Sequence, residues 1–252
     1  MDKNDKEDEQ PKGASSTPGK GGRVTMHDKV LASLQYGLMS GFFLPGQVLS
    51  LRKIAANLDT SLMPVRESVS RLVAAHALEE LPNRTVRVPK LSARGLIELF
   101  EVRTLIEGMA ARVACERVTD ELIEELGEIN DRLLAAHAQN DMGQVLIANK
   151  EFHFAIYRAA NSDILMPLIE SLWLRCGPTM YFSMNSPRNL WDTSMHLRLL
   201  DAFRAKDTGA AETAMVDDIM KTGAYLIAEA QREPETGPFA SLSNAFRLDR
   251  GL

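Results

Sequence analysis

The hydrophobic positions of this chain recur at helical spacing along most of its length. In the first such segment, residues 26–40, apolar side chains stand three or four residues apart and so share one face of a helix. Two shorter segments follow at residues 51–58 and 61–73, and each carries a serine where a helix would begin, Ser50 or Ser61. We expect the side-chain oxygen of each serine to cap its helix by accepting a hydrogen bond from a free backbone amide.

The two short helices are separated by a tight polar turn at Asp59 and Thr60. Residues 49–72 therefore have the pattern of a helix-turn-helix. The second helix turns Arg66 and Ser70 away from its apolar face, as a helix that reads DNA does. This stretch predicts binding to DNA rather than to a small substrate.

A hairpin pattern follows the second of these helices. Residues 79–81 and 86–88 read as two short strands around the polar turn at residues 82–85. Arg84 and Arg87 would stand at the tip of the hairpin, where they would reach phosphates or the minor groove. The sequence thus predicts a wing beside the helix-turn-helix.

The chain beyond Lys90 reads as helix, and no segment in it alternates as a strand does. Apolar residues recur at helical spacing in six segments, at residues 93–118, 120–139, 142–160, 164–184, 190–205 and 208–230. The pair Gly177-Pro178 should kink or interrupt the fourth segment, because proline lacks a backbone donor. The expected fold is mainly α, an N-terminal winged helix-turn-helix followed by an antiparallel bundle of about six helices.

Composition and charge divide the chain further. Residues 1–22 and 231–252 are polar and read as a disordered arm and a flexible tail. Between them we expect a DNA-binding domain at residues 23–90 and a helical effector-binding domain at residues 91–230. The first of these carries nine Lys/Arg against five Asp/Glu, and the second carries thirteen against twenty-one. A basic unit beside an acidic one fits a DNA-reading module attached to a domain that does not touch DNA.

Membrane insertion and secretion are not expected. No apolar run approaches the roughly 18 residues that a membrane span needs, and the N-terminus lacks the apolar core of a secretory signal. Cys115 and Cys176 lie far apart in apolar helical contexts. We therefore expect both thiols to be reduced and buried in a cytoplasmic protein with no membrane partner.

Three separate pieces of the N-terminal part resemble the winged-helix domain of GntR-type bacterial transcription regulators. They are GFFLPG at residues 41–46, PVRE at residues 64–67 and PNR at residues 82–84, in the order and spacing of that family. The resemblance and the helix pattern together place six residues at operator DNA: Arg52, Ser61, Met63, Arg66, Arg84 and Arg87. The alternative for Arg66 is an ion pair with Glu67 or Glu79.

Two positions depart from that family's pattern. Leu62 stands where many members carry an arginine, and Thr85 stands where the wing usually has glycine. A missing arginine removes one charge-assisted contact to DNA, so we expect an operator sequence that differs from the family's common one.

The helical part resembles the C-terminal ligand-binding domain, the FCD domain, of the FadR-like branch of that family. The matching pieces are Glu101–Arg103 with Glu107, Phe152-His153, Ala160-Asn161, His196, and Asp207 with Ala211 and Met215. Many such domains hold a divalent metal with an aspartate, a histidine one turn later and two further histidines. The resemblance carries that pattern onto Asn149, His153, His196 and Asp218.

The ligand set differs from the family's at two of its four positions. Asn149 replaces the aspartate and Asp218 replaces the last histidine, so a three-ligand site for Zn²⁺, Ni²⁺, Mn²⁺ or Fe²⁺ is the expectation if a metal binds. The alternative is that His153 and His196 bind an organic acid directly. Arg103 is a candidate counter-charge for a carboxylate effector, with an intradomain salt bridge as the alternative.

These patterns together predict a transcriptional regulator whose operator binding is controlled by a small carboxylate effector. One recognition helix covers only a half-site, so we expect a homodimer on double-stranded DNA. A second hypothesis is an all-helical metalloenzyme that uses His153, His196 and Asp218, and a third is a sensor of the metal itself. No separate general base or nucleophile stands out in the sequence to support the enzyme.

Overall fold

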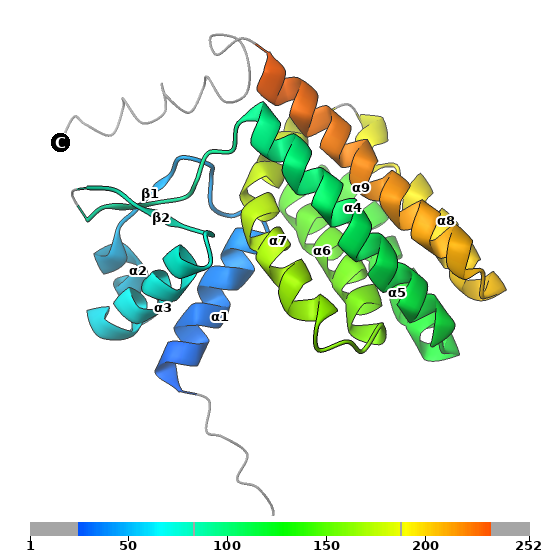
Figure 1. Ribbon diagram of the computed structural model, residues 1–252, viewed down its shortest axis with the longest axis horizontal. Helices are drawn as coiled ribbons and strands as arrows, with labels where there is room; N and C mark the ends of the chain where they lie inside the picture. Colours follow the sequence, from blue (N-terminus) through cyan, green and yellow to red (C-terminus); the bar gives the residue numbers. More distant parts are fainter. Residues whose placement is uncertain (1–24, 83, 187, 233–252) are drawn as a thin grey trace, which may run out of the picture.

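The computed structural model describes residues 25–82, 84–186 and 188–232, and the expected arm and nearly all of the expected tail lie outside them. A small unit of three helices and three short strands stands beside a larger helical bundle (Figure 1). Among the described residues, no helix is both long enough and apolar enough to cross a membrane.

The predicted helices and hairpin strands follow one another in the order that the hydrophobic pattern gives. The small unit contains α1 (Met26–Met39), β1 (Val48–Leu49), α2 (Leu51–Asn57), α3 (Leu62–Ala74), β2 (Glu79–Glu80) and β3 (Val86–Arg87). The bundle contains α4 (Ala93–Glu116), α5 (Asp120–Ala138), α6 (Met142–Ala159), α7 (Leu165–Met180), α8 (Ser194–Ala205) and α9 (Thr208–Gln231), with the 3₁₀ turns η1 (Tyr181–Asn185) and η2 (Arg188–Trp191) between α7 and α8. The predicted fold class, a winged helix-turn-helix followed by six antiparallel helices, is confirmed.

The helix starts of the small unit are set by side-chain caps, with one exception. The Ser50 hydroxyl accepts a hydrogen bond from the Lys53 amide, as predicted. The prediction for Ser61 was wrong: its backbone is extended, but its side chain caps no amide of α3 among the described residues. The third residue of α3 is Pro64, which has no N–H to donate, so the usual partner of such a cap is missing.

The wing is one side of a three-stranded sheet in the order β1-β3-β2. Both pairings are antiparallel, with Val48 opposite Arg87 and Glu80 opposite Val86. The strand β1 has only two residues, too few for an alternating pattern to reveal it in the sequence. In the hairpin turn Arg84 takes a left-handed backbone with φ of 60°, a conformation that favours glycine.

Of the two outcomes predicted for Gly177-Pro178, an interruption of the helix is not found at that pair. The helix α7 runs through Pro178 and ends at Met180, where η1 begins. Gly177 serves packing instead: a Cβ added to it would lie 2.3 Å from the Leu38 carbonyl oxygen and 2.6 Å from the Met39 Cα. The glycine thus lets α7 touch the end of α1.

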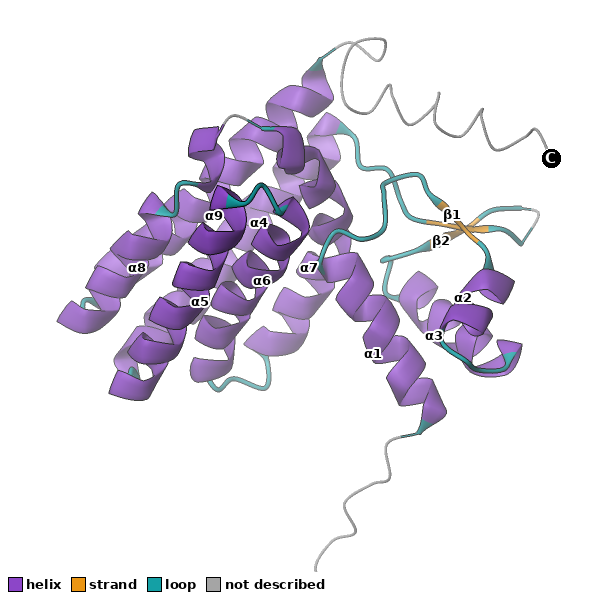
Figure 2. Ribbon diagram, turned by 180° about the vertical axis from the view of Figure 1, so that it is seen from behind, coloured by secondary structure: helices purple, strands orange, loops and turns teal. Residues whose placement is uncertain are grey.

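The helix α1 joins the two parts of the molecule. It packs against α3 on one side and against α7 on the other, and Figure 2 shows it between the winged unit and the bundle. Within the bundle, α4 and α9 pack along most of their length, and a Cβ added to Gly223 of α9 would lie 2.5 Å from the Phe100 ring of α4. This close contact holds α9 against α4 in a fixed register.

The predicted start of α8 was also wrong. The segment expected at residues 190–205 becomes α-helical only at Ser194, after η2 and a left-handed Thr193 with φ of 55°. This irregular connection places His196 in the first turn of α8.

Candidate functional site

The outer side of α3 carries the residues predicted to read DNA. Its inner side is buried through Val65, Val69 and Leu72, whereas Met63 is 70% exposed and Arg66 is exposed. Ser61 lies exposed at the start of the helix, and Arg52 lies exposed in the first turn of α2. The sequence pattern therefore assigned the faces of this helix correctly.

Arg66 has no carboxylate partner among the described residues. Glu67 accepts from Arg71 at 2.7 Å, and Glu79 accepts from Arg87 at 2.6 Å. Both carboxylates proposed as alternative partners are thus occupied by other arginines. The guanidinium of Arg66 is left exposed for another anion.

A groove of about 460 Å³ separates α3 from the wing. It is lined by Leu51, Arg66, Val69, Ser70, Val73, Ala74, Glu80, Arg84 and Val86. The groove brings Arg66 of the helix and Arg84 of the hairpin turn to one concave surface. Two cations on one concave surface are suited to binding a phosphate backbone.

Arg87 does not stand at the tip of the wing as predicted. It lies within β3, and its Nε donates to the Glu79 carboxylate on β2 at 2.6 Å. Residues 79 and 87 are opposite each other in the antiparallel register, which is why this cross-strand pair forms. Arg84, in the turn, keeps the expected position.

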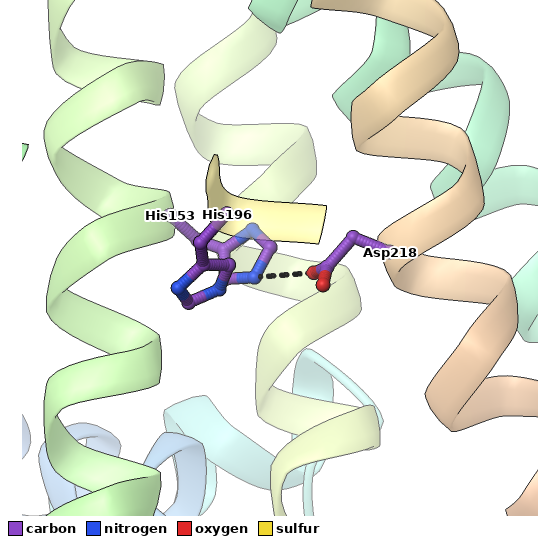
Figure 3. A group of neighbouring side chains, drawn as sticks. All are labelled: His153, His196 and Asp218. Atoms are coloured by element: carbon purple, nitrogen blue, oxygen red, sulfur yellow. Dashed lines mark ion pairs between the residues drawn. The ribbon is translucent and has the colours of Figure 1, made fainter. Parts of the chain in front are cut away.

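In the bundle, His153, His196 and Asp218 point toward one another from α6, α8 and α9 (Figure 3). One ligand atom from each residue lies within 4.8 Å of the other two. Both histidines are 2% exposed, and the His153 Nε2 lies 3.0 Å from an Asp218 carboxylate oxygen. Three of the four residues suggested by the resemblance therefore converge.

Asn149 lies one turn before His153 on α6 and is buried. It lines a cavity of about 10 Å³ together with His196 and Asp218, and with Trp191 and Lys221 at its other walls. This volume holds about one water-sized group. A cation or a water fits the cavity, whereas an organic acid would require side chains to move.

The protonation states of the site suit a cation. Burial lowers the pKa of His196 to about 4, against the opposing charge of Asp218, so its ring is neutral at pH 7. Burial raises the pKa of Asp218, but the hydrogen bond from His153, together with the electrostatic interactions with its other neighbours, Lys221 included, outweighs burial and leaves that pKa below its usual value. A neutral imidazole and a carboxylate are ordinary ligands of divalent metals.

One polar atom of the site is unpaired. The Nδ1 of His196 is buried without a hydrogen-bond partner in the part of the chain that the structure describes. Its ring stacks on Phe152 with centroids 3.9 Å apart and planes at 4°, which fixes its orientation. An unsatisfied buried nitrogen beside two further ligands is consistent with a site built to receive a bound group.

The alternative proposed for Arg103, an intradomain salt bridge, is the arrangement found. Its Nε and Nη2 donate to Glu107 at 2.6 and 3.1 Å, and it is 4% exposed. The guanidinium also lies about 5 Å from the rings of Phe100 and Trp173. Arg103 is thereby committed to the core rather than free to meet an effector carboxylate.

Sequence reasoning missed two residues beside the site. The Tyr157 hydroxyl lies 3.1 Å from the His153 Nδ1 and donates to Glu107. The i,i+4 spacing of His153 and Tyr157 was a usable signal, but the link to Glu107 was not, because the two residues are 50 positions apart. The expectation that Cys115 and Cys176 are free and buried is confirmed.

Comparison with known proteins identifies both parts of the chain. Residues 27–88 match the family described as bacterial regulatory proteins, gntR family, and residues 98–220 match the FCD domain. The HTH-type transcriptional regulator McbR of Escherichia coli K12 is 33% identical over 218 residues, which span 85% of this chain and 98% of that protein. The Nta operon transcriptional regulator of Aminobacter aminovorans is 29% identical over 175 residues, 69% of this chain and 82% of that one.

A solved structure agrees with these matches. The structure of E. coli McbR/YncC superimposes with a TM-score of 0.76 at 31% identity, covering 82% of this chain and 99% of that one. The relatives named above are transcriptional regulators, so the metalloenzyme hypothesis is rejected. The chain belongs to the GntR family and is a DNA-binding transcriptional regulator with a C-terminal FCD domain.

Proposed function

We propose that a small organic acid controls the operator binding of this regulator by entering the site between α6, α8 and α9, where it meets a divalent metal. The observation that carries the proposal is the convergence of His153, His196 and Asp218 within 4.8 Å of one another in a buried setting. Two imidazoles and one carboxylate leave coordination positions open on Zn²⁺, Ni²⁺, Mn²⁺ or Fe²⁺. A bound metal would supply a localised positive charge to which a carboxylate can bind.

The small volume of the cavity supports the proposal that the acid changes the conformation of the regulator when it binds. About 10 Å³ lies between Asn149, His196 and Asp218, so an acid enters only if the surrounding side chains or helices shift. A ligand that binds one arrangement better than another shifts the population toward it. Entry of the acid is therefore coupled to a rearrangement of α6, α8 or α9.

The helix α6 offers a direct route from the site to the DNA-binding unit. Three residues before His153, it carries Lys150, whose Nζ donates to the Ser40 hydroxyl at 3.1 Å and lies 3.6 Å from the Tyr36 ring centroid. Tyr36 belongs to α1 and Ser40 caps its C-terminal end. A shift of α6 would change this contact and with it the position of α1.

Two chains would be needed to read an operator with two half-sites. The helix α4 exposes Val102, Leu105 and Met109, which are spaced three and four residues apart and so form one apolar stripe. The neighbouring α7 carries the exposed Leu168 in its first turn, and the exposed Ile164 directly precedes it. We propose that a second copy of the chain covers this α4–α7 stripe, which would make a homodimer through the FCD domains.

At the DNA, Arg66 and Arg84 are proposed to contact the operator from the two walls of the groove, with Met63 beside them on the exposed face of α3. Arg52 and Ser61 would contact the backbone at the ends of α2 and α3. Such a regulator works in the compartment that holds its DNA, the cytoplasm.

Selection of binding sites from random double-stranded DNA tests the DNA part of this proposal. We expect one enriched sequence with two related halves, because a homodimer presents two identical recognition helices. The control part is tested on that operator with a panel of hydroxy, sugar and dicarboxylic acids, each with and without added Zn²⁺ or Ni²⁺. An operator affinity that no acid changes under either condition would remove effector control by this class of ligand.

A further inference from the structure

The carboxylate of Glu107 is the centre of a buried cluster of hydrogen-bond donors. It is 0% exposed and accepts from Arg103 at 2.6 and 3.1 Å and from the Trp173 Nε1 at 3.0 Å. The Tyr157 hydroxyl provides a further hydrogen bond. Arg103 and Glu107 form a buried ion pair, in which each charge balances the other.

The donors and acceptors of this cluster determine where its protons lie. Arginine and tryptophan can only donate, and an ionised carboxylate can only accept. The hydroxyl proton of Tyr157 must therefore be given to Glu107, which leaves the phenolic oxygen free to accept. The atom that faces this oxygen is the His153 Nδ1, at 3.1 Å, so Nδ1 must carry a proton and donate it.

This assignment fixes the role of the other ring nitrogen. With Nδ1 engaged by Tyr157, the His153 Nε2 is the atom that faces the site. In the metal-free protein it donates to the Asp218 carboxylate at 3.0 Å, and a bound metal would take the place of that proton. Histidines that bind metals commonly donate their second N–H to an anchored acceptor, which sets the tautomer and the ring orientation. Here the acceptor is Tyr157, and Glu107 anchors it.

We infer that Tyr157 and Glu107 are positioning residues that hold the His153 ring with Nδ1 protonated and with Nε2 directed at the ligand site. The inference rests on the proposed function for its metal part, since Nε2 is the atom that would bind the metal. It also identifies a part of the site that lies on α4, outside the helices that carry the ligands. The ligand class is a divalent transition metal, which would displace the Nε2 proton and bind the lone pair that this leaves.

The tautomer can be tested on the full-length wild-type protein, without any metal. Nitrogen-15 NMR of histidine-labelled protein would report the two ring nitrogens of His153, assigned by the signal that is lost in His153→Gln. We expect a protonated Nδ1 in slow exchange. A ring that carries its proton on Nε2 alone, with Nδ1 unprotonated, would overturn the inference whether or not the protein binds metal.

The positioning role is then tested with Tyr157→Phe, which removes one oxygen and keeps the ring. We expect the Nδ1 proton to exchange faster and the affinity for Zn²⁺, measured by calorimetry, to fall about 10- to 100-fold. Tyr181 lies in η1, after α7, and Tyr181→Phe is the matched control. It should leave both the exchange rate of the Nδ1 proton and the affinity for Zn²⁺ unchanged. A folded Tyr157→Phe protein with the wild-type tautomer, exchange rate and Zn²⁺ affinity would overturn the role.

The two readouts separate this inference from the proposed function. If wild-type protein binds no Zn²⁺ or Ni²⁺, the metal part of the proposed function fails, and the His153 ring signal still decides the inference. If wild-type protein binds metal but Tyr157→Phe changes only thermal stability, the hydroxyl is merely structural and the inference fails.

Discussion

The ammonium of Lys150 lies 3.1 Å from the Ser40 hydroxyl, so a residue of the helical bundle donates a hydrogen bond to the end of the first helix of the winged unit. Lys150 is 9% exposed and Ser40 is 1% exposed. The ammonium lies over the Tyr36 ring as well, at 3.6 Å, and no carboxylate within the described residues forms an ion pair with it. The groups that stabilise this buried charge belong mainly to the winged unit. The free energy of the charged lysine therefore depends on where that unit lies.

The pH dependence of stability should reveal this buried lysine. Burial lowers the pKa of Lys150 to about 8 in the folded protein, partly offset by nearby Glu151, from an ordinary value of 10.5. Between those two values the unfolded chain binds more protons, so the free energy of unfolding should rise with pH in that window. We expect wild type to gain on the order of 1–2 kcal/mol relative to Lys150→Met between pH 7.5 and 9.5.

Urea unfolding at the two pH values measures this difference. Lys53→Met, which changes an exposed lysine on α2, is the control and should follow the wild-type pH dependence. Parallel pH curves for wild type and Lys150→Met would show that Lys150 is not the titrating group.

Removal of the Arg66 side chain should weaken specific DNA binding. The guanidinium is exposed on α3 and unpaired among the described residues, so Arg66→Ala should reduce affinity for the selected operator by about 1–3 kcal/mol. Arg71→Ala is the matched control, because Arg71 lies on the same helix but is paired with Glu67 at 2.7 Å. Fluorescence anisotropy at one fixed salt concentration compares them, and equal affinities for both variants would refute the role of Arg66.

A charge placed in the apolar stripe of α4 should separate the two copies. Leu105 is 72% exposed, so Leu105→Glu should leave the monomer folded and should remove the homodimer by placing a charge in the interface. Leu134→Glu on α5, at a position 40% exposed, is the control for adding a charge at an exposed leucine. Light scattering after gel filtration gives the mass, and a Leu105→Glu protein that remains dimeric would place the interface elsewhere.

Loss of one ligand should abolish metal-dependent stabilisation. With Zn²⁺ at about 100 times its dissociation constant, a single site adds about 2.7 kcal/mol to the free energy of unfolding. We expect wild type to show a higher melting temperature with Zn²⁺ and a lower one after chelation, and His196→Ala to show neither change. His137→Ala, at the end of α5 and away from the candidate ligands, should behave as wild type. Equal responses in all three proteins would exclude His196 as a ligand.

Much of this fold was readable from the sequence because its elements are long or repeat a simple period. The six bundle helices span 12 to 24 residues each, long enough for helical spacing to stand out. The helix-turn-helix was recognisable from its buried face and its polar turn. The strand β1 was not, because it lies apart from the hairpin in the sequence and exists only through its pairing with β3.

The candidate site was only partly readable. His153, His196 and Asp218 came from a family pattern, and the structure brings them together. Two local expectations failed, the helix cap by Ser61 and the place of Arg87 at the tip of the wing. The reasons are a proline without an N–H and a carboxylate in the opposite strand. Such competing partners become visible only once the backbone is placed.

Gly177 makes the contact between the winged unit and the bundle a direct contact of two helix backbones. A Cβ at this position would lie 2.3 Å from the Leu38 carbonyl oxygen, so α7 and α1 meet through their backbones rather than through side chains. The distance between the winged unit and the bundle is therefore set by a rigid contact that few substitutions can adjust gradually. In a dimer, that distance contributes to the separation of the two recognition helices, and hence to the number of base pairs between the operator half-sites. If Arg66 and its neighbours read each half-site as proposed, the base sequence of the half-sites and the spacing between them would depend on different residues, with Gly177 acting on the spacing.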